Sequence, residues 1–280
     1  MLQIPFCEKI KASSIKEDIP NYLSDIFFEN IFKQQSLDNT IINELKNKLF
    51  DKRSVDFGLH YLPLGAKYGT LDIELKDLCV LDLTEEIGEG KLLFINYAPD
   101  NTIFPIEMHM NSPFQINRFS LQRTLAPINL CNTSNNTSYS KVRVFYVYLP
   151  KNCINDICIK ELSDAFYDYF NKDYNSSLLK LQIACEFILT RFLNKNGHND
   201  IKTQRMPYSK KLKSLLPKTI TDNNMIPCPS IITNEINNMR LKRNDIAHAG
   251  GSININDTDM RTWIITAFLF YKYFKVIHNV

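Results

Sequence analysis

The sequence has no run of apolar residues long enough to span a bilayer. Its first residues, MLQIPFCEKIKASS, contain too short an apolar run for a signal peptide. We therefore expect a soluble, cytoplasmic protein that does not contact membranes. In that setting the acceptor-like triplets of CNTSNNTSYS indicate a polar loop rather than glycosylation.

The sequence also lacks the spacings that hold metals, dinucleotides or disulfides. The 7 cysteines are scattered, and the nearest two, Cys153 and Cys158, lack the two-residue spacing of a zinc knuckle or a redox pair. We expect reduced thiols, as in most cytosolic proteins. No Walker loop and no GxGxxG is present, so the sequence predicts neither a metal nor a cofactor.

A large excess of one charge is missing as well. The net charge of +3 is too small to indicate nucleic-acid binding by the whole chain, so any basic surface must be local. With 280 residues, of which 44% are hydrophobic, the chain can bury a sizeable core in one large or two modest domains.

The composition changes near residue 150. Two helix-like segments, 21–32 and 39–50, come first. Segments rich in β-branched and aromatic residues follow and predict strands at 54–64, 69–75, 91–98, 104–110 and 141–149. The last of these, KVRVFYVYL, alternates only in its first half, which is typical of a central strand.

Pro150 ends the last predicted strand, and the remaining sequence has helical periodicity. Helices are predicted at 156–170, 176–193, 208–216, 230–248 and 257–277. The predicted fold class is therefore α+β. Residues 1–150 form a mixed domain of unknown fold, and residues 155–280 form an all-α bundle.

Two helices of this half are rich in apolar residues. In SSLLKLQIACEFILTRFL they cover most of the circumference, which predicts a central helix packed on all sides. The last helix is predicted to begin with Asp257 or Thr258 as its N-cap. Its aromatic stripe indicates core rather than a cofactor site.

One helix breaks its apolar pattern with a cation. Ile232, Ile236, Met239 and Ile246 share a narrow stripe of helix 230–248, and Arg243 lies on that stripe. A charge on a packed seam is costly unless it is paired or faces a cleft. Glu186 lies on an apolar stripe of the central helix, so a buried Arg–Glu pair that orders the bundle is one explanation.

The end of the same helix carries His248, followed by Gly250 and Gly251, a residue type that often terminates helices. The helix dipole favours the imidazolium there. A C-terminal capping role explains His248 alone, but it explains His248 and Arg243 together poorly.

The stretch RLKRNDIAHAGG therefore contains Arg-x4-His, with Asn244 after the arginine and glycine soon after the histidine. Together with a preceding helix that holds an acid and a final apolar helix, it resembles the HEPN superfamily of helical bundles over residues 155–280. The resemblance implies a homodimer whose motif helices face each other across a positive cleft. It also implies a metal-independent endoribonuclease.

The residue types suit that chemistry. In RNA the 2′-hydroxyl can attack the adjacent phosphate and leave a 2′,3′-cyclic phosphate, which requires proton transfer and a cation for the transition state. His248 is the candidate for the first role and Arg243 for the second. Asn244 orients His248 or the phosphate, or is merely a solvent-facing polar residue. On one ideal helix Arg243 and His248 point about 140° apart, so two chains are expected to build the site.

The segment before the motif helix is basic. Residues 201–219 contain no acid, and Tyr208 within them can stack on a base. The predicted RNA-binding residues are Lys202, Arg205, Tyr208, Lys210, Lys211 and Lys213. A solvated basic helix face is the alternative explanation.

Three functional hypotheses remain. The favoured one is a homodimeric endoribonuclease of antiviral defence or a toxin, acting on RNA such as tRNA, with residues 1–150 sensing a trigger ligand or protein. The second is a non-catalytic dimerisation and RNA-binding scaffold. In the third, the strand-rich half carries its own activity and the bundle only dimerises it.

Overall fold

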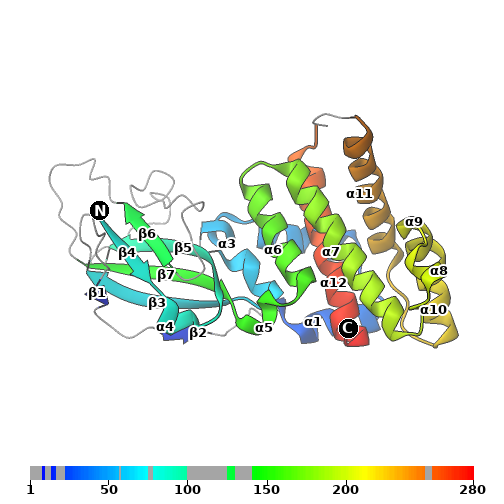
Figure 1. The fold of residues 1–280 in the computed structure, drawn as a ribbon, viewed down its shortest axis with the longest axis horizontal. Coiled ribbons are helices and arrows are strands. Elements are labelled where there is room, and N and C mark those ends of the chain that lie inside the picture. Colours follow the sequence, from blue (N-terminus) through cyan, green and yellow to red (C-terminus); the bar gives the residue numbers. More distant parts are fainter. Residues whose placement is uncertain are drawn as a thin grey trace. The chain divides into compact units, whose positions relative to one another are not determined.

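A computed structural model describes residues 8–9, 14–16, 23–56, 58–74, 78–99, 125–129, 141–249 and 254–280. The chain divides into two compact units, one built from 1–19 and 49–155 and the other from 20–48 and 156–280. The strands belong to the first unit and the long helices to the second (Figure 1). The predicted α+β character and the change near residue 150 are confirmed in this coarse form.

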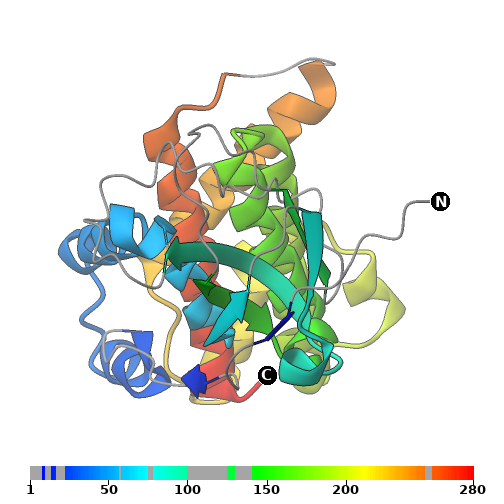
Figure 2. The ribbon, with the colours of Figure 1, turned by 90° about the vertical axis from the view of Figure 1, so that its left-hand side faces the viewer.

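The first unit contains an antiparallel five-stranded sheet in the order β1-β3-β7-β5, with β2 also paired to β3. A separate antiparallel pair joins β4 and β6. The strands, which Figure 2 shows turned by 90°, are β1 (Glu8–Lys9), β2 (Ser14–Lys16), β3 (Lys67–Glu74), β4 (Leu78–Asp82), β5 (Lys91–Pro99), β6 (Leu125–Asn129) and β7 (Lys141–Leu149).

Strand β7 is central, as its apolar second half predicts. It pairs with β3 through Thr70↔Phe145 and with β5 through Ile95↔Tyr146, and the β5 register shifts between Leu92 and Phe94. Pro150 follows β7 directly and precedes the short helix α5 (Lys151–Ile154). The predicted strand at 104–110 lies outside the described residues.

The predicted strand at 54–64 is wrong. This segment forms the end of α3 (Lys52–Asp56) and a 3₁₀ helix, Leu59–Leu64. The 3₁₀ helix is bracketed by Gly58 and Gly65, both left-handed, with φ of 65° and 87°. A Cβ on Gly58 would lie 2.6 Å from Phe94, so the chain turns where only glycine fits. A short helix, α4 (Thr84–Ile87), lies between β4 and β5 in the chain.

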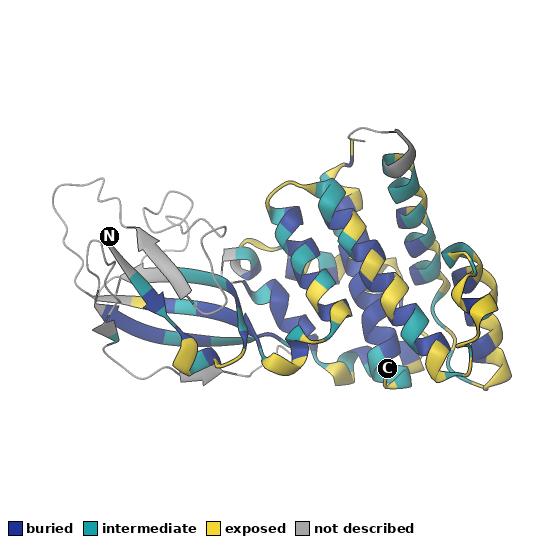
Figure 3. Cartoon of the chain, in the orientation of Figure 1, coloured by how far each residue is buried: buried dark blue, intermediate teal, exposed yellow. Residues whose placement is uncertain are grey.

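The second unit is a helical bundle. Its helices are α1 (Asp25–Lys33), α2 (Asn39–Leu49), α6 (Ile157–Phe170), α7 (Tyr174–Lys195), α8 (Ile201–Gln204), α9 (Tyr208–Lys210), a π turn (Lys211–Leu215), α10 (Leu216–Asp222), α11 (Ser230–Ala249) and α12 (Asp257–His278). Helix α12 is buried along most of its length, and α6, α7, α11 and α1 pack around it (Figure 3). The four long predicted helices of this half are confirmed within a few residues. No helix among the described residues has the length and apolar character needed to cross a membrane.

Two expectations about this unit need correction. Helices α1 and α2 belong to the bundle and not to a domain of residues 1–150. Lys272 of α12 is buried and donates to Asp25 of α1 at 2.6 Å, and Phe28 meets Phe268 edge to face with ring centroids 5.3 Å apart. The N-cap of α12 is Asn256, whose side chain accepts from the Asp259 amide, because Asp257 instead accepts from tyrosine hydroxyls.

Candidate functional site

Helix α11 carries the predicted motif, and its apolar seam holds it in the bundle. Ile232, Ile236 and Met239 are fully buried on the predicted stripe, while Arg243, the next position, is half-buried. The stripe is therefore confirmed up to the arginine. Met239 is covered by the bundle of its own chain and is not available to a partner.

Arg243 is only partly paired. Its Nη1 donates to Asn244 Oδ1 over a long 3.4 Å. Its Nε is buried and has no hydrogen-bond partner among the described residues, nor does any described carboxylate form an ion pair with the guanidinium. A buried donor without a partner normally costs stability, so this arginine is not explained as a structural ion pair.

Glu186 does not form the expected pair with Arg243. It is exposed on α7 and accepts a hydrogen bond from Gln182 Nε2 at 3.0 Å. The expectation failed because the stripe of Leu179 and Ile183, on which Glu186 was placed, faces outward and not into the bundle.

Arg240 is a cation that the sequence reasoning did not single out. It is half-buried, one helical turn before Asn244, and its Nε and Nη2 donate to Asn237 Oδ1 at 3.4 and 3.3 Å. Its charge also acts on the Tyr208 hydroxyl of α9. The signal was present in the letters RLKR, where a second arginine precedes Arg243 on the flank of the same seam.

The backbone of His248 lies in the last turn of α11, but its side chain, Gly250 and Gly251 lie outside the described part of the chain. The spacing alone places positions 240, 244 and 248 on one stripe of the helix, because residues four apart share a face. Position 248 therefore lies on the same face of α11 as Arg240 and Asn244.

Tyr208 is not positioned as a free stacking platform. Its hydroxyl is buried without a hydrogen-bond partner among the described residues. Burial raises the pKa of Tyr208, the negative charge of Glu186 adds to this, and Arg240 opposes it. The phenol end of the ring therefore lies inside the protein, and the expected stacking of a base on this ring needs correction to that extent.

The basic segment is helical over most of its length and divides into exposed and buried cations. Lys202, Arg205, Lys210 and Lys213 are exposed. Lys211 lies in the π turn, is buried, and donates from Nζ to the Gln204 carbonyl at 3.3 Å. The prediction that Lys211 binds phosphate is therefore wrong, because the π turn directs its side chain inward.

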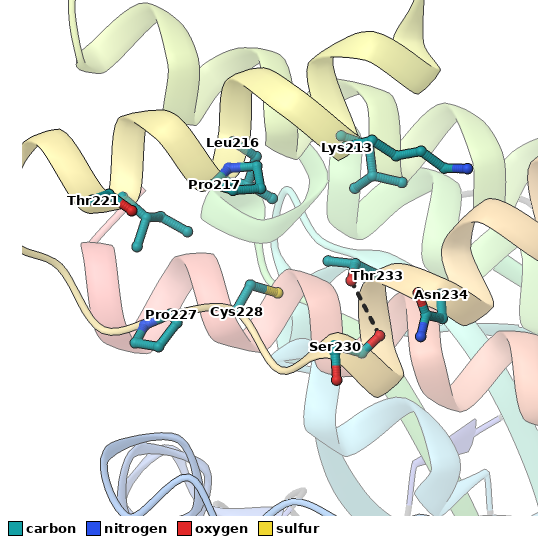
Figure 4. Close-up of a pocket in the computed structure, with 11 residues that line it drawn as sticks. Lys213, Leu216, Pro217, Thr221, Pro227, Cys228, Ser230, Thr233 and Asn234 are labelled. Atoms are coloured by element: carbon teal, nitrogen blue, oxygen red, sulfur yellow. Dashed lines mark hydrogen bonds between the residues drawn. The ribbon is translucent and has the colours of Figure 1, made fainter.

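A pocket of about 510 Å³ lies between α10 and the first turn of α11 (Figure 4). Its floor is apolar, with Leu212, Leu216 and Ile220, and Lys213 contributes a cation to its lining. Asn234 on its rim is nine residues before Arg243, which corresponds to about 14 Å along the helix. The pocket and the motif are therefore separate features at different levels of α11.

The remaining histidines and cysteines have structural surroundings where they are described. His278 packs on Phe192 and Tyr273, and burial lowers its pKa to about 4. His198 bonds Thr219 at 2.9 Å, and His60 is buried. The cysteines at 153, 158, 185 and 228 are free thiols. His109 lies outside the described residues.

The geometry thus assembles Arg240, Arg243 and Asn244 on one part of α11 and leaves Arg243 without a carboxylate among the described residues. Such a group of forked donors can bind a phosphate. Within the described residues no group of three His, Cys, Asp or Glu side chains is placed to hold a metal ion. Comparisons of the chain with family models, with curated proteins and with solved structures gave no match.

Proposed function

We propose that the protein is an endoribonuclease of the HEPN type, acting as a homodimer, with Arg243, Asn244 and His248 at the reacting phosphate. The observation that carries the proposal is the incomplete pairing of Arg243. A half-buried guanidinium with an unused donor costs stability, and a phosphate oxygen is the acceptor that its planar fork suits best.

The reaction requires no group that the chain lacks. The 2′-hydroxyl of RNA loses its proton to a neutral imidazole, its oxygen bonds to phosphorus, and the 5′-oxygen leaves with a proton from an imidazolium. Two copies of His248, one from each chain, supply the base and the acid. Arg243 stabilises the charge on the phosphorane oxygens, where donors fixed in advance contribute most. The products are a 2′,3′-cyclic phosphate and a free 5′-hydroxyl.

The exposed cations of the basic segment have a supporting role in this proposal. Lys213, in the π turn, lines the pocket beside Ser230 and Asn234 in the first turns of α11, and Arg240 follows these positions by six to ten residues, which is about 9 to 15 Å along the helix. A single strand of RNA running along α11 would contact both. Lysines read phosphate as point charges, so this surface contributes affinity and salt dependence rather than sequence preference.

The first unit is proposed to sense a trigger and to control the bundle, as in defence or toxin proteins. The decisive experiment follows RNA in EDTA with wild type, Arg243→Ala and His248→Ala, and maps the ends of any product. Cyclic phosphate ends formed by wild type and by neither variant support the proposal. RNA binding without cleavage by wild type would favour the non-catalytic scaffold.

Expression in a bacterial host provides the second test. Toxicity of the wild type that His248→Ala removes, at equal protein level, is expected for a nuclease that degrades host RNA. Toxicity that persists in both His248→Ala and Arg243→Ala would assign the effect to the strand-rich unit instead.

A further inference from the structure

The pocket between α10 and α11 has the size and the fixed floor of a small-molecule site. Its volume of about 510 Å³ falls within the range that such sites occupy. Leu212, Leu216 and Ile220 form the floor and are 1%, 1% and 5% exposed, so the bundle holds them in place. The floor is therefore formed before a ligand arrives, and little has to be ordered on binding.

The wall opposite α10 is the segment 225–229, which joins α10 to α11. The buried Tyr273 of α12 donates from its hydroxyl to the Ile226 carbonyl at 2.7 Å and so anchors this segment to the bundle. Two residues of the segment, Pro227 and Cys228, line the pocket, and Figure 4 shows them across the cavity from α10. The wall is therefore held in position as well as the floor.

The π turn before α10 places an apolar residue and a cation side by side in the pocket. Leu212 and Lys213 are consecutive in this turn (Lys211–Leu215), and both line the cavity. Turns of this kind are rare and occur often at functional sites. The Lys213 ammonium forms no hydrogen bond or ion pair with another described residue, so its charge is available to a ligand.

The chemistry of the lining selects an aliphatic anion. Among the 11 residues that line the pocket none is aromatic and none is acidic. A nucleobase normally stacks on an aromatic side chain, so the aliphatic floor fits a saturated chain better than a base. Burial raises the pKa of the Cys228 thiol, which therefore stays neutral. No negative charge of the lining opposes a bound anion.

The groups that suit an anion lie together at one end of the pocket. In Figure 4 Lys213 and Asn234 lie at one end, and Thr221 and Pro227 lie at the other. The Asn234 amide, like the Lys213 ammonium, forms no hydrogen bond with another described residue. Ser230 and Asn234 belong to the first turns of α11, a helix of 20 residues whose dipole adds partial positive charge here. A cation, an amide donor and a helix N-terminus together suit a carboxylate.

We propose that this pocket binds an aliphatic carboxylate of medium chain length, with its chain along the apolar floor and its carboxylate beside Lys213 and Asn234. Lys213 and Thr221 are eight residues apart along the π turn and α10, which corresponds to about 12 Å. An extended decanoate chain covers a distance of this order. The Arg243 motif lies further along α11, so binding at the pocket can be measured without RNA.

The test is isothermal titration calorimetry of the full chain with sodium decanoate. One molecule is expected to bind per chain, and octanoate, which is two methylenes shorter, should bind about tenfold more weakly. Lys213→Gln should weaken decanoate binding about fivefold, because a partly exposed charge pair is lost. The matched control is Lys218→Gln, which replaces an exposed lysine of α10 that does not line the pocket. It should bind decanoate as wild type does.

A second pair of variants tests whether the ligand lies inside the cavity. Thr233→Trp introduces a large side chain from α11 into the pocket and should reduce the affinity for decanoate by more than about tenfold, because the chain loses its place on the floor. Asn238→Trp introduces the same side chain at an exposed position of α11 that does not line the pocket, and it should leave the affinity unchanged. All variants are checked for folding by circular dichroism.

Several results would overturn the proposal. Wild type that binds no decanoate at millimolar concentration is one, and decanoate binding that Lys213→Gln and Thr233→Trp leave unchanged is another. Equal affinities for octanoate and decanoate would show that the chain does not lie on the apolar floor. Tighter binding of adenosine or uridine monophosphate than of decanoate would assign the pocket to a nucleotide. None of these measurements depends on RNA cleavage, so the pocket and the nuclease are tested separately.

Discussion

Replacing Arg243 by methionine should stabilise the helical unit while removing RNA cleavage. The Nε of Arg243 is buried without a partner among the described residues, and such an unsatisfied donor costs about 1 to 3 kcal/mol. Methionine keeps an unbranched stem of similar length on the seam, so the packing loss should stay below about 1.5 kcal/mol. We expect a net gain of roughly 0.5 to 1.5 kcal/mol in the free energy of unfolding.

The assay is urea denaturation followed by the fluorescence of Trp263, the single tryptophan of the chain, which lies in α12 and is buried there. The matched control is Arg191→Met. Arg191 donates to Asp156 at 2.9 and 3.4 Å, so its removal breaks a real ion pair. Because the pair is partly exposed, the loss should be only about 0.5 to 1 kcal/mol.

The free energy of unfolding should therefore rise in Arg243→Met and fall in Arg191→Met. A loss of more than about 1 kcal/mol in Arg243→Met, comparable to or larger than the loss in Arg191→Met, would refute the reasoning and make Arg243 a structural residue. A gain in stability together with full cleavage activity would refute its role at the phosphate. Stability gained with activity lost is the combination expected of a group held under strain for function.

Three further predictions concern neighbouring groups. Burial alone would raise the pKa of the Asp156 carboxyl, but the Arg191 charge and the amides of α6 outweigh burial and hold this pKa below 3.8. The stability that the ionised carboxylate contributes is therefore present above pH 4 and is lost as the pH falls through the lowered pKa. Asp156→Asn should thus cost about 1 kcal/mol at pH 7 and progressively less as the pH is lowered through the acid range, measured by denaturation at a series of pH values. Neutralising Lys210 and Lys213 together should weaken RNA binding and flatten its salt dependence, while cleavage at saturating RNA changes little; an unchanged salt slope would contradict this. Glu186→Gln should change the free energy of unfolding by less than about 0.5 kcal/mol in the same denaturation assay, and a larger loss would restore it as a structural partner.

The helices of the second unit were predictable because their apolar residues recur at helical spacing over many turns. The seam of Ile232, Ile236 and Met239 was read directly from that spacing and is buried. The central strand β7 was recognised in the same way from its apolar second half. The prediction of a strand at 54–64 failed because buried apolar and aromatic residues without strict alternation fit a strand or a 3₁₀ helix equally. The left-handed conformations of Gly58 and Gly65 favour the 3₁₀ helix.

The candidate site was predictable only in part. The sequence identified Arg243 by its place on an apolar seam and Tyr208 as a candidate RNA-binding residue. It indicated neither Arg240 nor the effect of the Arg240 charge on Tyr208, which depends on packing between helices distant in the chain. Nor does periodicity reveal which apolar helix faces are covered within one chain. Leu179 and Phe187 follow the same pattern as their buried neighbours, and only the arrangement of α6, α11 and α12 around α7 leaves them open.

The ion pair of Lys272 with Asp25 connects positions 247 residues apart and so bears on the order in which the protein matures. During synthesis α1 emerges early, but the aromatic and charged surface that receives it belongs to α12, which the ribosome makes last within this chain. The bundle can close only when both are present, since contacts between such distant segments form late. Under the proposed function, a nuclease site on α11 would therefore not form before α12 has been made.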